Sequence, residues 1–107
     1  PFIRLAEMYL IRAESNLRLG TEVGATPLED INTIRTRAGA TSLSSVNLEE
    51  VLDERLRELA FEGFALFDAK RLKRDVGDIS YDADRLVLPI PLREIDANPN
   101  LVQNEGY

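Results

Sequence analysis

The sequence predicts an all-α protein, with about four helices in antiparallel pairs followed by an irregular Pro- and Asn-rich tail. Apolar residues recur every three or four positions over most of the first two thirds of the chain, which is the spacing of one helix face. Glycines follow the periodic segments, and the connections are short, as between antiparallel neighbours. Proline and asparagine accumulate after Gly77, so no long helix is expected there.

The first helix is predicted over residues 2–19, and Gly20 is expected to end it. Two alanines, Ala6 and Ala13, would let a neighbouring helix approach closely. The residues that keep helical spacing are Leu5, Met8, Leu17, either Ile11 or Arg12, and Tyr9, which is expected in the core.

The second helix is predicted over about residues 27–38, with Gly39 at its end. Thr26 can cap its N-terminus, Pro27 suits the first turn, and the acidic Glu29 and Asp30 favour the positive end of the helix dipole. The side chains expected to point inward are Leu28, Ile31, Ile34 and Ala38.

The third helix is predicted from Leu48 to the interruption at Gly63, and Asn47 with Glu50 can form a capping box at its start. A fourth helix is predicted at about residues 64–75, and one continuous helix bent at Gly63 is the alternative. The residues that mark the buried face of the third helix are Val51, Leu52, Leu59 and either Arg55 or Leu56.

The tail contains Pro89 and Pro91, which predict an extended segment over residues 86–91. One helical turn is expected over residues 92–97. Exposing so many apolar side chains to water is unfavourable, so part of the tail is expected to pack on the helices. Its large apolar residues are Leu86, Val87, Leu88, Ile90, Ile95 and Leu101.

The composition excludes several classes of function. The 107 residues include 13 basic and 19 acidic side chains, giving a net charge of −6, which argues against nucleic acid as a partner. There is neither Cys nor His, so a zinc site of those ligands, a thiol nucleophile and a Ser-His-Asp triad are absent from this sequence, and no cofactor is expected.

No stretch resembles a membrane span or a signal peptide. Because the chain begins at Pro1, it is expected to be a processed or excised piece.

Three glutamates, Glu54, Glu58 and Glu62, recur every four residues and would form an acidic stripe on one helix face. A hydrolase with paired carboxylates is one interpretation, with Asp68 as a further acid. Side chains on one helix point the same way, however, and leave no room for a substrate between them. We favour structural ion pairs, in which Glu58 or Glu62 bonds to Arg35 or Arg37 of the second helix.

A metal site is not expected. The segment DISYDAD at residues 78–84 contains Asp78, Asp82 and Asp84, but it lacks the glycine and the closing glutamate of a calcium-binding EF-hand loop.

Aromatic side chains, which commonly hold sugar rings, are few. There is no Trp, and Phe61, Phe64 and Phe67 have the spacing of buried residues. Tyr81 and Tyr107 remain in predicted loops. The candidate ligand-binding residues are therefore Tyr81 and, among its polar neighbours, Arg85.

Four stretches in this order resemble the C-terminal part of the SusD/RagB family: IRLAEMYLIRAE (3–14), INTIRTRAG (31–39), ERLRELAFEGFALFDAKR (54–71) and LPIPLREIDANPNLVQNEGY (88–107). The resemblance implies a tetratricopeptide-like helical fold, with residues 1–107 as one domain that is a fragment or a shortened relative. It also implies a non-catalytic role in an outer-membrane lipoprotein of the cell surface that binds nutrients, usually glycans.

The resemblance further implies a TonB-dependent outer-membrane transporter as partner and an anchor on a lipidated N-terminal Cys that this chain lacks. Oligosaccharide would be bound by parts of the protein outside this chain. Two alternatives stay open at this point: a free-standing helical-repeat module that grips a peptide, and a small carboxylate enzyme.

Overall fold

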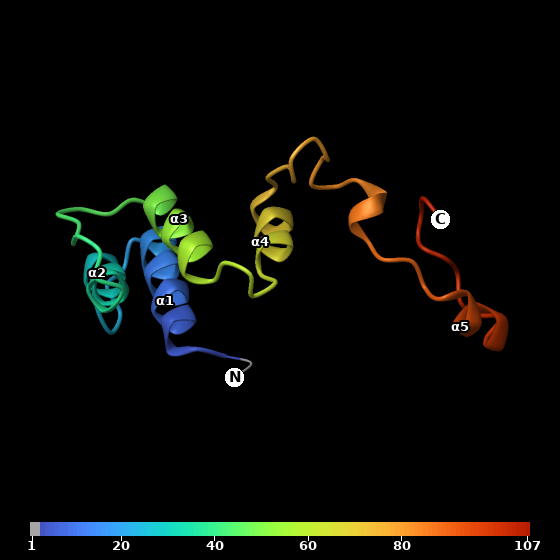
Figure 1. Cartoon of the computed structure of the whole chain (residues 1–107), viewed down its shortest axis with the longest axis horizontal. Helices are drawn as coiled ribbons and strands as arrows, with labels where there is room; N and C mark the ends of the chain where they lie inside the picture. Colours follow the sequence, from blue (N-terminus) through green and yellow to red (C-terminus); the bar gives the residue numbers. More distant parts are fainter. Residues whose placement is uncertain (1–2) are drawn as a thin grey trace. The chain divides into compact units, whose positions relative to one another are not determined.

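The computed structural model describes residues 3–107 and contains, in that range, helices but no β-strand beyond an isolated bridge between Val76 and Ile79. The all-α prediction is confirmed. The chain divides into two compact units, unit 1 (Pro1–Gly63) and unit 2 (Phe64–Tyr107). The elements in order are α1 (Leu5–Leu19), α2 (Pro27–Arg37), α3 (Leu48–Glu58), α4 (Ala65–Leu72), the short 3-10 helix η1 (Asp84–Leu86) and α5 (Leu92–Ala97) (Figure 1).

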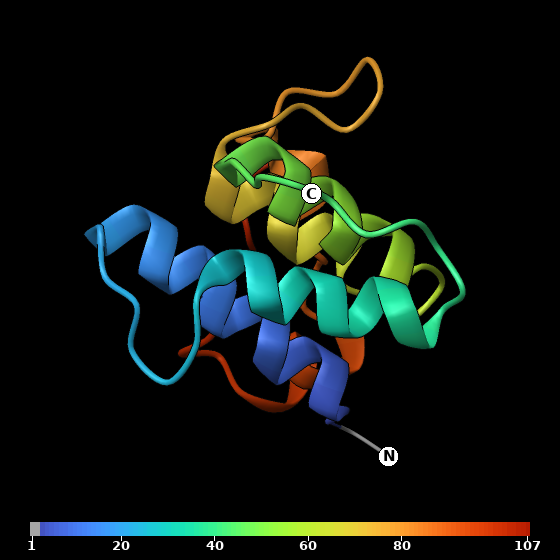
Figure 2. The same cartoon turned by 90° about the vertical axis from the view of Figure 1, so that its left-hand side faces the viewer.

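Unit 1 is a cluster of three helices in which α1 contacts both α2 and α3 (Figure 2). Leu10, Ile31 and Val51, one from each helix, are fully buried at its centre. Truncating one such side chain to Ala typically costs about 2–5 kcal/mol. The remaining buried apolar residues are Ala6, Ala13, Ile34, Leu52 and Leu59.

The buried face of α1 differs from the predicted one. Ala6, Leu10 and Ala13 face the core. The small alanines let the neighbouring helices approach α1 closely, so the predicted stripe of larger residues points away. Leu5, Met8 and Ile11 are exposed, and Tyr9, Arg12 and Leu17 are partly buried. The helix also begins at Leu5, because Arg4 has extended backbone angles; the predicted start at residue 2 lies outside the described residues.

The predicted N-cap of α2 and the predicted capping box of α3 are confirmed, and Thr26 and Glu29 also form a capping box that was not predicted. Thr26 Oγ1 accepts a hydrogen bond from the Glu29 N–H at 3.2 Å, and Glu29 Oε2 accepts one from the Thr26 N–H at 2.8 Å. Asn47 and Glu50 make the same reciprocal pair at the start of α3. Gly20 ends α1 in the left-handed conformation, as predicted.

The core faces of α2 and α3 were predicted more accurately than that of α1. Ile31 and Ile34 of α2 are buried, although Leu28 is partly exposed and Ala38 is exposed. On α3 the sequence left Arg55 and Leu56 as alternatives, and it is Arg55 that is buried while Leu56 is exposed.

The end of α3 corrects the prediction around Gly63. The helix stops at Glu58, and the chain turns over several residues, with Phe61 in a left-handed conformation at φ 64° as well as Gly63 at φ 84°. Helical spacing therefore no longer applies at Phe61, which is fully exposed instead of buried. Neither the long third helix nor the continuous bent helix is present. In unit 2, Phe67 of α4 is also exposed, contrary to prediction, and Phe64 is partly buried.

The tail of unit 2 becomes extended at Val87, and α5 forms at the predicted helical turn, but Leu86 belongs to η1, so the predicted extended segment does not begin at residue 86. The extended stretch bonds to the end of the same tail. Gln103 accepts from the Ile90 N–H at 2.8 Å and donates to the Ile90 carbonyl at 2.9 Å, while Asn104 donates to the Leu88 carbonyl at 2.7 Å. Docking of residues 86–90 on the helices stays a prediction.

Candidate functional site

The carboxylates of the acidic stripe bond to arginines on or next to the other two helices. We call this set the arginine–glutamate network: Glu54 and Glu58 of α3, Glu62 beyond the end of α3, Arg4 just before α1, and Arg35 and Arg37 of α2. Glu58 is its centre. Arg37 Nη2 lies 2.6 Å from one Glu58 carboxylate oxygen, and Arg4 Nη2 lies 3.1 Å from the other. Arg4 also donates to the Glu58 backbone carbonyl at 2.8 Å and reaches Glu62 at 2.7 Å. One arginine at the start of α1 thus holds the last turn of α3 and the residues beyond it.

The second half of the network is centred on Glu54, whose side chain is 8% exposed. Arg35 Nη1 donates to it at 2.8 Å and Arg57 Nη1 at 3.3 Å. Arg35 also donates to the Thr41 carbonyl at 2.7 Å and so fixes the loop after α2. Arg35 therefore joins α2 to α3 and to the loop after α2, whereas Arg57 pairs with Glu54 within α3.

The structure places the four predicted ion-pair residues as follows. Arg37 and Glu58 are brought together, whereas Arg35 bonds to Glu54 and Glu62 bonds to Arg4. Sequence reasoning missed Arg4, because the spacing within a helix gives no information on a contact between residues 54 positions apart. An arginine immediately before a helix was the only signal for it.

A separate ion pair joins α1 to α2. The Arg12 guanidinium donates to both carboxylate oxygens of Asp30, at 2.9 and 2.6 Å, and Asp30 is 1% exposed. These hydrogen bonds raise the pKa of Arg12 above its ordinary value. The same guanidinium lies 5.6 Å from the centre of the Tyr9 ring, a cation–π distance. The pair satisfies an aspartate that would otherwise be buried and alone.

The chemistry available to these carboxylates is limited. A general acid or base needs a carboxyl group free to exchange a proton with a substrate. Glu54, Glu58 and Glu62 instead accept hydrogen bonds from guanidinium groups of neighbouring elements. Over residues 3–107, no group of three or more acidic, His or Cys side chains is arranged to hold a metal ion. The arrangement can fix three helices together, and this is the role that the geometry supports.

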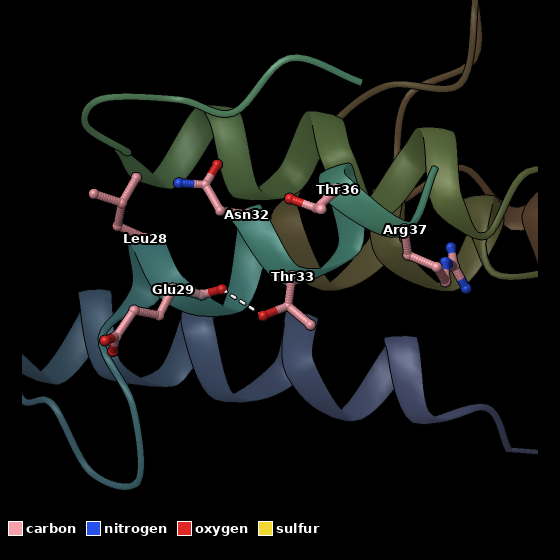
Figure 3. Close-up of a pocket in the computed structure, with 6 residues that line it drawn as sticks. All are labelled: Leu28, Glu29, Asn32, Thr33, Thr36 and Arg37. Carbon is pink, nitrogen blue, oxygen red and sulfur yellow. Dashed lines mark hydrogen bonds between the residues drawn. The ribbon is translucent and has the colours of Figure 1, made fainter. Parts of the chain in front are cut away.

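A shallow hollow lies along the exposed side of α2 and is drawn in Figure 3. Thr33 Oγ1 donates to the Glu29 carbonyl of the same helix at 2.8 Å. Asn32 makes two hydrogen bonds to the backbone of Leu43. Because a single helix lines the hollow and several of its polar groups are already bonded, it offers little to a ligand. The lining residues are Leu28, Glu29, Asn32, Thr33, Thr36 and Arg37.

The two candidate ligand-binding residues lie in unit 2. Tyr81 is partly buried, and its backbone N–H donates to Asp75 Oδ1 at 3.1 Å. Arg85 is exposed on η1. In the described part of the chain, no hydrogen bond or ion pair joins their side chains. Tyr107, the other predicted loop tyrosine, is exposed.

Comparison with known proteins identifies the family. Residues 1–85 match the model of the SusD family. The chain belongs to the SusD family.

Relatives of this SusD-family chain include the starch-binding protein SusD of Bacteroides thetaiotaomicron, which is 35% identical. The alignment covers all of this chain and 21% of that protein. The SusD-like protein P38 of Formosa agariphila is 31% identical, with 97% of this chain and 24% of that protein aligned. The chain thus spans about a fifth to a quarter of the length of these curated relatives.

Solved structures of the family superpose on this chain. A protein of Bacteroides vulgatus matches with a TM-score of 0.85 and 35% identity. The match covers all of this chain and 28% of the Bacteroides vulgatus protein. The surface glycan-binding protein A of Bacteroides uniformis matches with a TM-score of 0.79 and 33% identity, covering 96% and 27%. In the described residues of the present SusD-family chain, no helix has both the length and the apolar character needed to span a bilayer.

Proposed function

We propose that this chain is the non-catalytic helical scaffold of a longer cell-surface protein that binds nutrients, with glycans as the proposed class of nutrient. The observation behind the proposal is the arginine–glutamate network. It uses the acidic side chains of α3 to hold the three helices of unit 1 together, with Arg4, Arg35 and Arg37 as partners. A catalytic or metal-binding role would require some of these carboxylates to be free.

The proposed ligand class comes from the relatives, one of which is called a starch-binding protein and another a surface glycan-binding protein. We place the main glycan contacts outside residues 1–107. Tyr81 and Arg85 are not joined into one site, and the hollow on α2 has no aromatic residue in its lining. Sugar sites generally combine a flat apolar surface with converging polar groups.

The same proposal includes a location and a partner. The longer protein would be held at the outer membrane by a lipid on an N-terminal Cys and would work with a TonB-dependent outer-membrane transporter. Family membership supports both points. The transporter partner would account for a surface location, because a captured glycan has to be passed across the membrane.

Three measurements on cells that produce the protein test this proposal. An antibody against this chain should detect a protein roughly three and a half to five times as long, the ratio given by the 21–28% coverage of its relatives. Protease added to intact cells should remove it, and it should co-purify with a TonB-dependent transporter. A 12.0 kDa protein that resists external protease would overturn the proposal and favour the free-standing interaction module.

A further inference from the structure

The end of the tail in unit 2 bonds to the beginning of the tail through a side-chain amide. After α5 the chain turns back, so residues 103–104 lie beside residues 88–90 (Figure 1). The Gln103 amide accepts from the Ile90 N–H at 2.8 Å and donates to the Ile90 carbonyl at 2.9 Å. A side-chain amide has the same donor and acceptor groups as a peptide bond. Gln103 therefore bonds to Ile90 in the way that the backbone of a paired strand would.

This contact depends on the amide of Gln103. Among residues 89–91, Ile90 provides the only N–H group, because the prolines on either side of it have none. Gln103 Oε1 also accepts from the Asn104 N–H at 2.9 Å, which fixes the direction of the amide oxygen. A glutamate at this position would keep the acceptor for the Ile90 N–H but would turn a second acceptor towards the Ile90 carbonyl. The closed arrangement thus requires a donor and an acceptor on the same side chain.

A second contact joins the far end of the tail to η1. A Cβ atom at Gly106 would lie 2.8 Å from the Asp84 Cβ, and the backbone of Gly106 has φ +89°. Asp84 is itself held in η1, because its carbonyl accepts from the Val87 N–H at 2.8 Å. The backbone at residue 106 thus lies closer to η1 than any residue with a side chain could lie without a shift. Between the two contacts, Asn104 donates to the Leu88 carbonyl at 2.7 Å.

We propose that these contacts form a latch that opens and closes as one unit, and we call it the tail latch. Its members are Gln103, Asn104 and Gly106 on one side and Asp84, Leu88 and Ile90 on the other. The contacts share one short segment, residues 103–106, so a shift at either end moves the groups that bond at the other end. Contacts linked in this way open together as a local unfolding unit with its own free energy. The latch lies wholly within unit 2 and is independent of the proposed function.

Hydrogen exchange of the Ile90 amide in the native protein tests the tail latch. Pro89 and Pro91 carry no amide hydrogen, so the Ile90 signal is separate from those of its neighbours. Gln103→Glu should speed this exchange about tenfold, the factor expected for the loss of one hydrogen bond. Asn100→Asp is the control, since it adds the same charge to the same tail, and it should leave the rate unchanged. Exchange from α1, α2 and α3 should be unchanged in both variants.

Gly106→Ala separates a single latch from a set of independent contacts. This substitution does not touch the pair of Gln103 and Ile90, yet it should also speed exchange at Ile90 about tenfold, because opening at Asp84 releases residue 103. Gly77→Ala is the control within unit 2, since Gly77 has φ +62° and open space around it, and it should leave the rate unchanged.

Three results would overturn the inference. The first is an Ile90 amide that exchanges in the unsubstituted protein as fast as in an unfolded chain. The second is an unchanged rate in Gln103→Glu or in Gly106→Ala. The third is a loss of protection throughout α1, α2 and α3 in these variants, since the faster exchange at Ile90 would then come from global unfolding.

Discussion

At the scale of single residues, Glu58 and Glu62 of the acidic stripe should differ in their contribution to stability. The Glu58 side chain is 9% exposed and bonds to two arginines, whereas that of Glu62 is 36% exposed and bonds to Arg4. We expect Glu58→Gln to lower the free energy of unfolding by about 2 kcal/mol, since hydrogen bonds between charged groups contribute roughly 1.5–3 kcal/mol. Glu62→Gln should cost less than about 1 kcal/mol.

Urea unfolding of both variants measures this difference. The two substitutions remove the same charge and keep nearly the same shape, so each is the control of the other. Equal losses of stability would contradict the assignment of Glu58 as the centre of the network.

Gly24 tests the ion pair between Arg12 and Asp30. A Cβ atom at this position would lie 2.8 Å from Arg12 Nη1, and the backbone has φ +82°. Gly39 has a similar φ of +72° but open space around it. Gly39→Ala should therefore cost about 1 kcal/mol from backbone strain alone. Gly24→Ala should lower the urea midpoint further, because Arg12 is held by Asp30 and cannot move aside without weakening that pair.

This prediction would be contradicted if the two glycine variants unfolded at the same urea concentration. Such an outcome would mean that the Arg12 side chain can move aside without loss of stability. The ion pair with Asp30 would then contribute little to the packing of α1 on α2.

At the scale of helices, the capping box of α2 should make stability depend on pH. Hydrogen bonds from the Thr26 N–H and hydroxyl lower the pKa of Glu29 below its ordinary value of 4.5. The folded protein therefore holds this proton less tightly than the unfolded chain. The stabilisation is present above the ordinary pKa and is lost as the pH falls through the lower folded value.

Glu29→Gln keeps an acceptor for the Thr26 N–H but cannot titrate. Wild type should thus exceed this variant in urea midpoint at neutral pH, and the difference should diminish as the pH falls below the ordinary value of 4.5 and through the lower folded pKa. Glu22→Gln, in the loop before α2, is the charge-matched control. A difference between wild type and Glu29→Gln that is constant with pH would show that the capping box does not respond to protonation.

The helices also show what the sequence could and could not predict. Capping residues such as Thr26 and Asn47 bond to backbone groups within four positions, so the local sequence was sufficient to predict these helix starts. The rotation of α1 was not predictable in this way, because Leu5 and Leu10 are equally apolar and only packing on α2 and α3 decides between them. Phe61 was misplaced for a related reason: its burial was inferred from a helix that ends at Glu58.

At the scale of the whole molecule, the chain alone should not bind a glycan with useful affinity. One stacked ring contributes roughly 1 kcal/mol, whereas association costs on the order of 4 kcal/mol or more. Phe61 and Phe67, which the sequence had assigned to the core, are exposed and add one ring to each unit. Calorimetric titration with neutral and acidic oligosaccharides should show no saturable binding at micromolar concentration.

Two variants make this titration decisive. Saturable binding that Tyr81→Ala or Phe67→Ala abolishes would place a ligand site within this chain and contradict the prediction.

The family itself was identifiable from four ordered stretches of sequence. The ligand surface was not, since contacts between residues far apart in the chain, such as Arg4 with Glu58, determine which side chains remain available.

The amide side chains at the end of the tail have a consequence for self-association. An extended apolar segment with unpaired backbone groups is a template on which other chains add as strands. In residues 88–90, however, Gln103 and Asn104 already occupy the carbonyl of Leu88 and both backbone groups of Ile90. Pro89 and Pro91 have no N–H to offer. Another chain could therefore add as a strand at residues 88–90 only by breaking these three hydrogen bonds, which disfavours β-sheet growth on this part of the tail.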